Sequence, residues 1–295
     1  MPLRTAPDNL VTRRHVVQTL TGCAAHLAAA ALVLPASARR LFAAPRLPVV
    51  AAEPFGRLER VADGVWALIS TPFGGDRTTL ANGGLIAGTQ AVLAIEGFFQ
   101  PAGAAWLAAQ SVALTGRHPT HVLLTHHHAD HVTGVTGYAR GAEAPLRVTD
   151  AGTLDLGGRT VRIRQLRGHT ARDLVVVCDD PAVTFAGDLM WNGIFPNYVD
   201  ADPVALRESV TWVGRQRTPI VPGHGSVADA ASFARYAALL DEIEAAARRG
   251  HAAGVTAAVA AQGWAAPASL GDWTLFNPSF TERAFAAWYK QLGTR

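Results

Sequence analysis

Histidine and aspartate side chains gather in one short stretch of this chain. The sequence reads H-x-H-x-D-H from His126 to His131, directly after the short apolar run at 121–125. Two imidazoles two residues apart can point to one side of a loop, and the next aspartate and histidine can turn to a second point nearby. Zinc binds imidazole nitrogen and carboxylate oxygen, and a catalytic zinc keeps one position free for water. One loop could therefore begin two adjacent metal sites.

Three further residues have the same chemistry, and each follows a strand-like run and lies beside a glycine. They are His169 in GHT, Asp188 in GD and His224 in PGHG. Glycine lets the backbone turn sharply and come close to an ion. A single histidine after a strand is usually an ordinary polar loop residue, and His127, between two ligands, is expected to face away from them. The pattern predicts a metal site made of seven residues: His126, His128, Asp130, His131, His169, Asp188 and His224.

The segments around these residues predict alternating strands and helices. Short apolar runs separated by Gly, Asp and Asn turns fill 58–70, 83–88 and 91–99, and 101–114 is rich in helix formers after a proline. Residues 159–168 alternate apolar and polar, as a half-buried strand does, and two buried-strand candidates end in aspartate at 180 and 188. Helices are predicted at 203–215 and 226–249, and two more within 251–295. This order indicates α/β layers, with helices packed on sheets.

The N-terminal segment predicts export. A basic TRR, an apolar alanine-rich stretch and an A-S-A sequence ending at residue 38 make a secretory signal peptide, and the adjacent arginines resemble a twin-arginine signal. The alternatives are an uncut membrane anchor and lipidation at Cys23. The predicted organisation is a leader at 1–38, a linker at 39–55, the main domain at 56–250 and a C-terminal helical extension at 251–295. The mature chain is expected to be periplasmic or secreted.

Charge argues against a nucleic-acid partner. The whole chain has 26 basic and 23 acidic residues and a pI near 9.2, but removal of 1–38 leaves 23 against 22. A nearly neutral chain has no overall attraction for phosphate. No other stretch is long and apolar enough to span a bilayer, so no stable membrane insertion is expected after cleavage. Cys178, in an apolar run, is interpreted as a buried structural cysteine.

The succession H-x-H-x-D-H, G-H-T, G-D and P-G-H-G resembles the metallo-β-lactamase superfamily, and its glyoxalase II-like branch best, over 57–225. The resemblance implies an α/β fold, a four-layer αββα sandwich with the metals in a cleft at one sheet edge. It implies that His126, His128 and His169 hold one metal. It likewise implies that Asp130, His131 and His224 hold a second metal, and that Asp188 bridges the two.

Two features depart from the family pattern. Glu96 stands where members usually carry an aspartate, so the geometry of a group that supports the ligands is put in question. The stretch at 132–168 is short, and a strand-and-helix piece around 141–145 is expected to be reduced. Such a reduction would thin the scaffold beside the cleft, lower stability or open the site.

The expected reaction is hydrolysis of a small-molecule ester, thioester, lactam or lactone. Two Zn²⁺ ions roughly 3.5–4 Å apart would hold a bridging hydroxide that attacks the carbonyl, with Asp130 as the catalytic residue that orients the water or accepts its proton. By resemblance, lactamase branches have Cys or Ser at the position of Asp188, which argues against β-lactams as the main substrate. The loop after Asp188 is expected to line the cleft mouth or, alternatively, to pack as ordinary core and turns: Trp191, Asn192, Phe195, Asn197 and Tyr198.

Two other functions remain open. Persulfide dioxygenases share this pattern but use one Fe²⁺, held by the equivalents of His126, His169 and Asp188, and imidazole and carboxylate suit both metals. The other is a non-catalytic metal-binding protein that has kept its ligands. The sequence does not define an oligomeric state.

Overall fold

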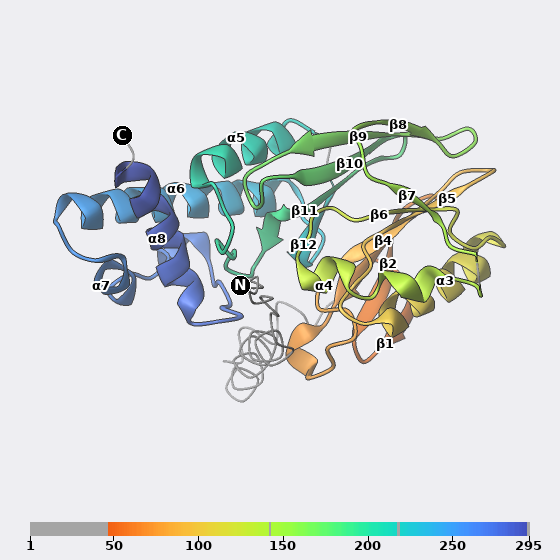
Figure 1. The fold of residues 1–295 in the computed structure, drawn as a ribbon, viewed down its shortest axis with the longest axis horizontal. Helices are drawn as coiled ribbons and strands as arrows, with labels where there is room; N and C mark the ends of the chain where they lie inside the picture. Colours follow the sequence, from red (N-terminus) through yellow and green to blue (C-terminus); the bar gives the residue numbers. More distant parts are fainter. Residues whose placement is uncertain (1–46, 142, 217–218, 294–295) are drawn as a thin grey trace, which may run out of the picture.

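Two facing β-sheets with helices on their outer sides form the body of the protein (Figure 1). The computed structural model describes residues 47–141, 143–216 and 219–293. The predicted leader at 1–38 lies outside the described residues, as does the first part of the predicted linker. Among the described residues, none of the helices combines the length and the hydropathy needed to cross a membrane.

The first sheet has seven strands in chain order. Its first five strands are antiparallel, and β5, β6 and β7 run parallel to one another. The strands are β1 (Val49–Glu53), β2 (Gly56–Ala62), β3 (Val65–Ser70), β4 (Gly83–Ala87), β5 (Val92–Ile95), β6 (His121–Leu123) and β7 (Leu146–Val148).

The second sheet has five strands in the order β12-β11-β10-β9-β8. All neighbours are antiparallel except β11 and β12, which run parallel. The strands are β8 (Gly152–Asp155), β9 (Thr160–Leu166), β10 (Asp173–Asp179), β11 (Ala182–Asn192) and β12 (Ile220–Gly225).

Helices complete the four layers. The first sheet is covered by α3 (Pro101–Thr115), and the short α4 (Ala129–Val132) and the 3-10 turn η3 (Val135–Tyr138) follow β6. The second sheet is covered by α5 (Pro203–Gly214) and α6 (Ala230–Ala252). The predicted αββα sandwich is therefore confirmed, with apolar side chains between each pair of layers.

The β3 sequence VWALIS shows why some strands are apolar throughout. Alternate side chains of a strand point to opposite faces. Val65, Ala67 and Ile69 pack between the two sheets, while Trp66 and Leu68 pack on the side of α3. A strand that is covered on both faces has no polar side, so it appears in the sequence as a continuous apolar run.

Local signals fix the helix ends. Asp202 precedes α5 and its carboxylate accepts hydrogen bonds from the backbone N–H of Val204 and Ala205, at 3.1 Å each. Asp229 caps α6 in the same way through Ser232. The predicted start of that helix at 226 was too early, because β12 continues to Gly225 and the cap lies at Asp229.

One other boundary prediction needs correction. The predicted linker at 39–55 includes β1, which pairs antiparallel with β2, so Val49–Glu53 belong to the first sheet. The prolines that suggested a linker lie on either side of this strand. The short stretch at 132–168 still contributes η3, the brief edge strands β7 and β8, and the longer strand β9, so it extends both sheets.

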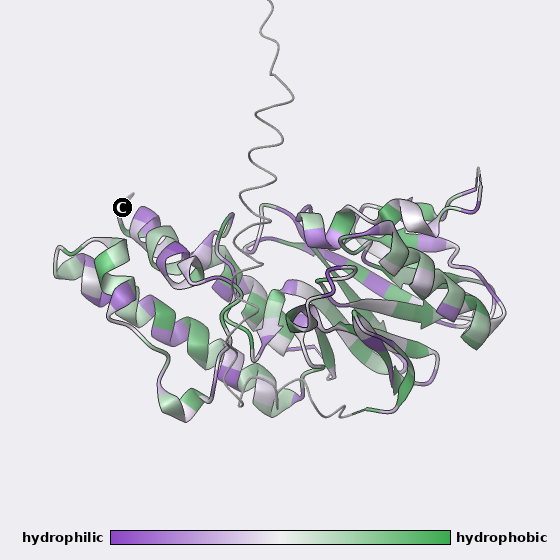
Figure 2. Cartoon of the chain, turned by 90° about the horizontal axis from the view of Figure 1, so that it is seen from below, coloured by the Kyte–Doolittle hydropathy of each residue, from purple (hydrophilic) through white to green (hydrophobic). Residues whose placement is uncertain are grey.

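The C-terminal helices continue the main core. After α6 come α7 (Ala257–Gln262), the 3-10 turn η4 (Ala268–Leu270) and α8 (Ser279–Gly293). Phe280, Phe285 and Trp288 of α8 are buried against α6. Figure 2 shows these helices carrying both apolar and hydrophilic residues, as expected for amphipathic helices with one packed face.

Candidate metal centre

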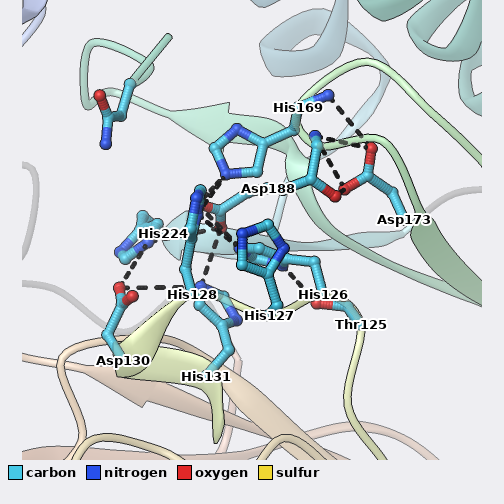
Figure 3. Close-up of polar contacts among 12 residues, drawn as sticks. Thr125, His126, His127, His128, Asp130, His131, His169, Asp173, Asp188 and His224 are labelled. Atoms are coloured by element: carbon cyan, nitrogen blue, oxygen red, sulfur yellow. Dashed lines mark hydrogen bonds and ion pairs between the residues drawn. The ribbon is translucent and has the colours of Figure 1, made fainter. Parts of the chain in front are cut away.

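The seven predicted ligands meet at one edge of the sandwich, and both sheets contribute to them (Figure 3). The H-x-H-x-D-H segment follows β6 of the first sheet and runs into α4. The other three come from the second sheet: His169 follows β9, Asp188 lies in β11 and His224 lies in β12. The prediction that Asp188 ends its strand was wrong, because β11 continues to Asn192 after a register shift near Gly187.

Three imidazole nitrogens converge in a first group. His128 Nδ1 lies 3.0 Å from His126 Nε2 and 2.9 Å from His169 Nε2. One ring nitrogen carries either a single proton or a single lone pair, so it cannot fully satisfy both neighbours by hydrogen bonding. Separations of this size are, however, those of ligand atoms placed about 2 Å from a common ion.

A second group lies beside the first. His131 Nε2 is 3.7 Å and His224 Nε2 is 3.4 Å from Oδ2 of Asp130. One ligand atom from each of these three residues lies within 4.8 Å of the others, so the group could also hold a metal ion.

Asp188 stands between the two groups and turns one carboxylate oxygen to each. Its Oδ2 lies 3.3 Å from His169 Nε2 and 3.9 Å from His126 Nε2. Its Oδ1 lies 3.2 Å from His131 Nε2 and 3.4 Å from His224 Nε2. This is the arrangement of a carboxylate that bridges two ions.

The first glycine of PGHG, Gly223, is required because the Asp188 carboxylate lies close to its backbone. A Cβ at Gly223 would lie 1.8 Å from Oδ1 of Asp188, far inside van der Waals contact. Gly187 has φ 51°, a left-handed conformation that favours glycine, and a Cβ there would meet Thr125. Both glycines let neighbouring segments approach the ligands closely, as the sequence suggested.

Several buried ligand atoms have no hydrogen-bond partner among the described residues. They include Oδ1 of Asp188 and Nε2 of both His131 and His224. An unsatisfied buried polar atom costs about 1–3 kcal/mol, so three at one point need an explanation. Divalent cations would satisfy all three, and the donor set of imidazoles and carboxylates fits zinc or iron.

Without a metal, the two groups differ in protonation. Burial lowers the pKa of His169 to about 4 and holds that of His126 well below its usual value. Burial also opposes the charged form of His224, but Asp188 and Asp130 outweigh it and raise its pKa to about 9. His126 and His169 are therefore neutral near pH 7, while His224 carries a proton that a metal must displace.

Three carboxylates outside the predicted set hold the ligands in position. Oε1 of Glu96 lies 3.0 Å from His131 Nδ1, and Glu96 also accepts hydrogen bonds from the backbone N–H and hydroxyl of Thr125. The additional methylene of glutamate thus still reaches the ligand it supports. A carboxylate this close to the outer nitrogen of a metal-binding imidazole helps to set the tautomer and orientation of the ring.

The other two carboxylates are Asp173 and Asp200. Asp173 accepts hydrogen bonds from the backbone N–H groups of His169 and Thr170, and burial raises its pKa to about 6. Oδ2 of Asp200 lies 2.9 Å from His128 Nε2. The spacing within GHTARD could have indicated Asp173, but nothing in the sequence links Asp200 to a histidine so far away in the chain.

Phe195 and Tyr198, for which the sequence leaves substrate contact and core packing open, lie in the core. Their side chains are only 2% and 3% exposed and belong to the core between β11 and the outer helices. Asn192 donates a hydrogen bond to the Ser226 carbonyl at 3.0 Å, so its amide joins the end of β11 to the residue after β12. The segment alternates between core and turn positions, which the apolar and amide residue types alone did not distinguish.

The remaining two residues of that loop have other contacts. The Trp191 ring stacks on His224 with centroids 4.0 Å apart, and its Nε1 donates to the Asp188 carbonyl, so it supports the ligands from behind. Asn197 accepts hydrogen bonds from the backbone of Val199 and from Arg283 of α8.

The exposed side of the centre is limited to a few side chains. Asp130 is 29% exposed and His128 17%, while His126, His131 and Asp188 are 3% exposed or less. His127 is 68% exposed and points away from the ligand groups toward Asp200, as expected. A small molecule would therefore reach the centre past Asp130 and His128.

Comparisons with known proteins agree with this geometry. The profile of the metallo-beta-lactamase superfamily matches residues 97–150. The hydroxyacylglutathione hydrolase of Rhodopseudomonas palustris (strain BisA53) is 34% identical over 88 residues, which are 25% of this chain and 34% of that protein. That of Acidiphilium cryptum (strain JF-5) is 30% identical over 156 residues, 47% of this chain and 63% of the relative. The chain thus spans about a third of the length of the first relatives it matches.

Solved structures show the same fold. A stereoselective inverting sec-alkylsulfatase from Pseudomonas sp. aligns with a TM-score of 0.66 at 13% identity, over 92% of this chain and 62% of its own. A metallo-β-lactamase from Erythrobacter litoralis aligns with a TM-score of 0.54 at 18% identity, over 66% of this chain and 100% of its own. The ordered motifs, the family match over 97–150 and these relatives together show that the chain resembles the metallo-β-lactamase superfamily.

Proposed function

We propose that the protein is an exported hydrolase that holds two zinc ions and cleaves a small-molecule ester, thioester, lactam or lactone. The observation that carries the proposal is Asp188, whose two oxygens are divided between two separate ligand groups. When bound, the two ions would lower the pKa of water and polarise the scissile carbonyl.

The residues around the centre each have a defined task. Asp188 fixes the separation of the two positions. Asp130 is the most exposed of its ligand group, so its carboxylate can orient a water at the opening or accept a proton from it. Glu96 and Asp200 orient the imidazoles of His131 and His128 by contacting their outward-facing nitrogens.

The relatives support carbonyl chemistry. The curated proteins that match are named hydroxyacylglutathione hydrolases, so a thioester is one of the substrate classes to test. Export rests on the predicted leader at 1–38, which also places the protein away from a cytosolic thioester pool. By the family resemblance, the aspartate at position 188 argues against β-lactam hydrolysis as the main activity.

The first test is the metal content of the mature chain, purified without chelator and measured by mass spectrometry. We expect two zinc ions per chain, with hydrolysis of at least one ester, thioester or lactone. The variants H131A and H224A should each lose one ion, whereas H127A, which removes an exposed histidine beside the ligands, should keep both. One iron per chain would refute the two-zinc proposal and favour sulfur oxidation, and a chain that binds no metal would refute the ligand assignment.

A further inference from the structure

Aromatic rings from three separate segments gather on the His224 side of the metal centre. The Phe276 ring, from the C-terminal extension, lies 5.4 Å from His224 and 6.1 Å from Trp191. Phe73, from the 3-10 turn η2 (Pro72–Gly74) after β3, stacks on Phe276 with centroids 4.7 Å apart and planes at 19°. The C-terminal extension therefore reaches a predicted metal ligand directly.

The position of Phe276 is fixed on both sides along the chain. Thr274 forms an isolated bridge beyond the end of β11, with hydrogen bonds of 3.0 Å to the Gly193 carbonyl and 2.9 Å from the Phe195 N–H. Four residues after Phe276, the buried Phe280 anchors α8 in the core. A side chain held between two such anchors loses little freedom when a ligand packs against it.

The side chains around the metal centre differ in polarity between its two sides. Beside the first ligand group lie polar, exposed side chains, His127 and Asp200. Beside the second group lie Phe73 and Phe276, both only partly buried. Exposed aromatic surface next to a reactive centre is what an apolar part of a substrate would cover.

We propose that Phe276 and Phe73 form a subsite for an aliphatic or aryl group of the substrate and set its selectivity. This inference rests on the proposed hydrolysis. It narrows the substrate class to carbonyl compounds in which one side of the scissile bond carries an apolar group. Each methylene that such a surface buries should raise kcat/KM about fourfold.

The kinetic test compares two series of esters, one lengthened on the acyl side from acetyl to hexanoyl and one lengthened on the alcohol side. In the wild type, kcat/KM should rise with chain length in at least one series. F276A and F73A should lose at least tenfold more activity on the hexanoyl or hexyl ester than on the shortest one, and F276L should recover most of the difference. W106A, which truncates a half-buried aromatic residue on α3 packed against Phe55, serves as the matched control and should leave the slope unchanged.

A second readout is binding without turnover. Isothermal titration should show hexanoate binding at least tenfold more tightly than acetate to the wild type and to W106A, but not to F276A. Hydrolysis of both series with no dependence on chain length, together with equal binding of the two acids, would overturn the subsite and leave the hydrolase proposal intact. Preserved preference for hexanoate without hydrolysis of any ester would support the subsite and count against the hydrolase proposal.

Discussion

Replacement of Asp200 by alanine should weaken metal binding at the first ligand group. Its Oδ2 lies 2.9 Å from His128 Nε2 and 3.5 Å from His127 Nε2, and its side chain is 48% exposed. Loss of a carboxylate that orients a metal-binding imidazole typically costs 10–100-fold in affinity. Because water can replace part of this contact at an exposed position, we expect the lower end, about tenfold or about 1.4 kcal/mol.

The assay is competition for zinc between the protein and a fluorescent chelator, which resolves the two binding steps. D200A should weaken one step about tenfold and leave the other within about twofold, and D200N should behave in the same way if charge is what orients the ring. H127A removes the second neighbour of Asp200 and should leave both steps unchanged. Unaltered zinc affinity in D200A, or equal weakening of both steps, would refute the assignment of Asp200 to His128.

Three further predictions concern the same centre. G223A should lose both metals, because its Cβ would lie 1.8 Å from Oδ1 of Asp188. The control G263A, where no heavy atom lies within 4 Å of the added Cβ, should keep both. The measurement is the metal content of the two folded variants. Metal binding at the second ligand group should weaken as pH falls through about 9, because Asp188 and Asp130 raise the pKa of His224 to about 9 and its proton must leave when a metal binds. Titration calorimetry in buffers of different ionisation enthalpy should show proton release in the wild type at about pH 8 and less release in H224A. Removal of both metals by chelator should lower the free energy of unfolding by about 8 kcal/mol, about 4 kcal/mol for each ion, relative to protein in free zinc at a thousand times the dissociation constant of each site. An unchanged denaturation midpoint would contradict this prediction.

The ligand residues could be predicted because each lies in a short pattern with its own chemistry. The H-x-H-x-D-H loop and the glycines beside His169, Asp188 and His224 are local features, and the fold follows from the same motifs through the family resemblance. The structure brings all seven side chains together.

The supporting and lining residues could not be found in this way. Asp200 contacts a histidine 72 positions earlier, and no spacing rule connects them. Phe276 contacts His224 only because Thr274 is bridged to the end of β11, which is a tertiary contact. Conversely, residue type alone leaves substrate contact and core packing open for Phe195 and Tyr198, and the structure places both side chains in the core.

Each ligand group takes side chains from both sheets: the loop after β6 supplies one part, and β11, β12 and the loop after β9 supply the other. Each ion would thus be bound by side chains from both sheets and would hold the two sheets together. Neither sheet alone carries a complete set of ligands for either ion. Loading must therefore follow closure of the sandwich. For an exported chain, the compartment in which the sheets close would decide which metal it carries.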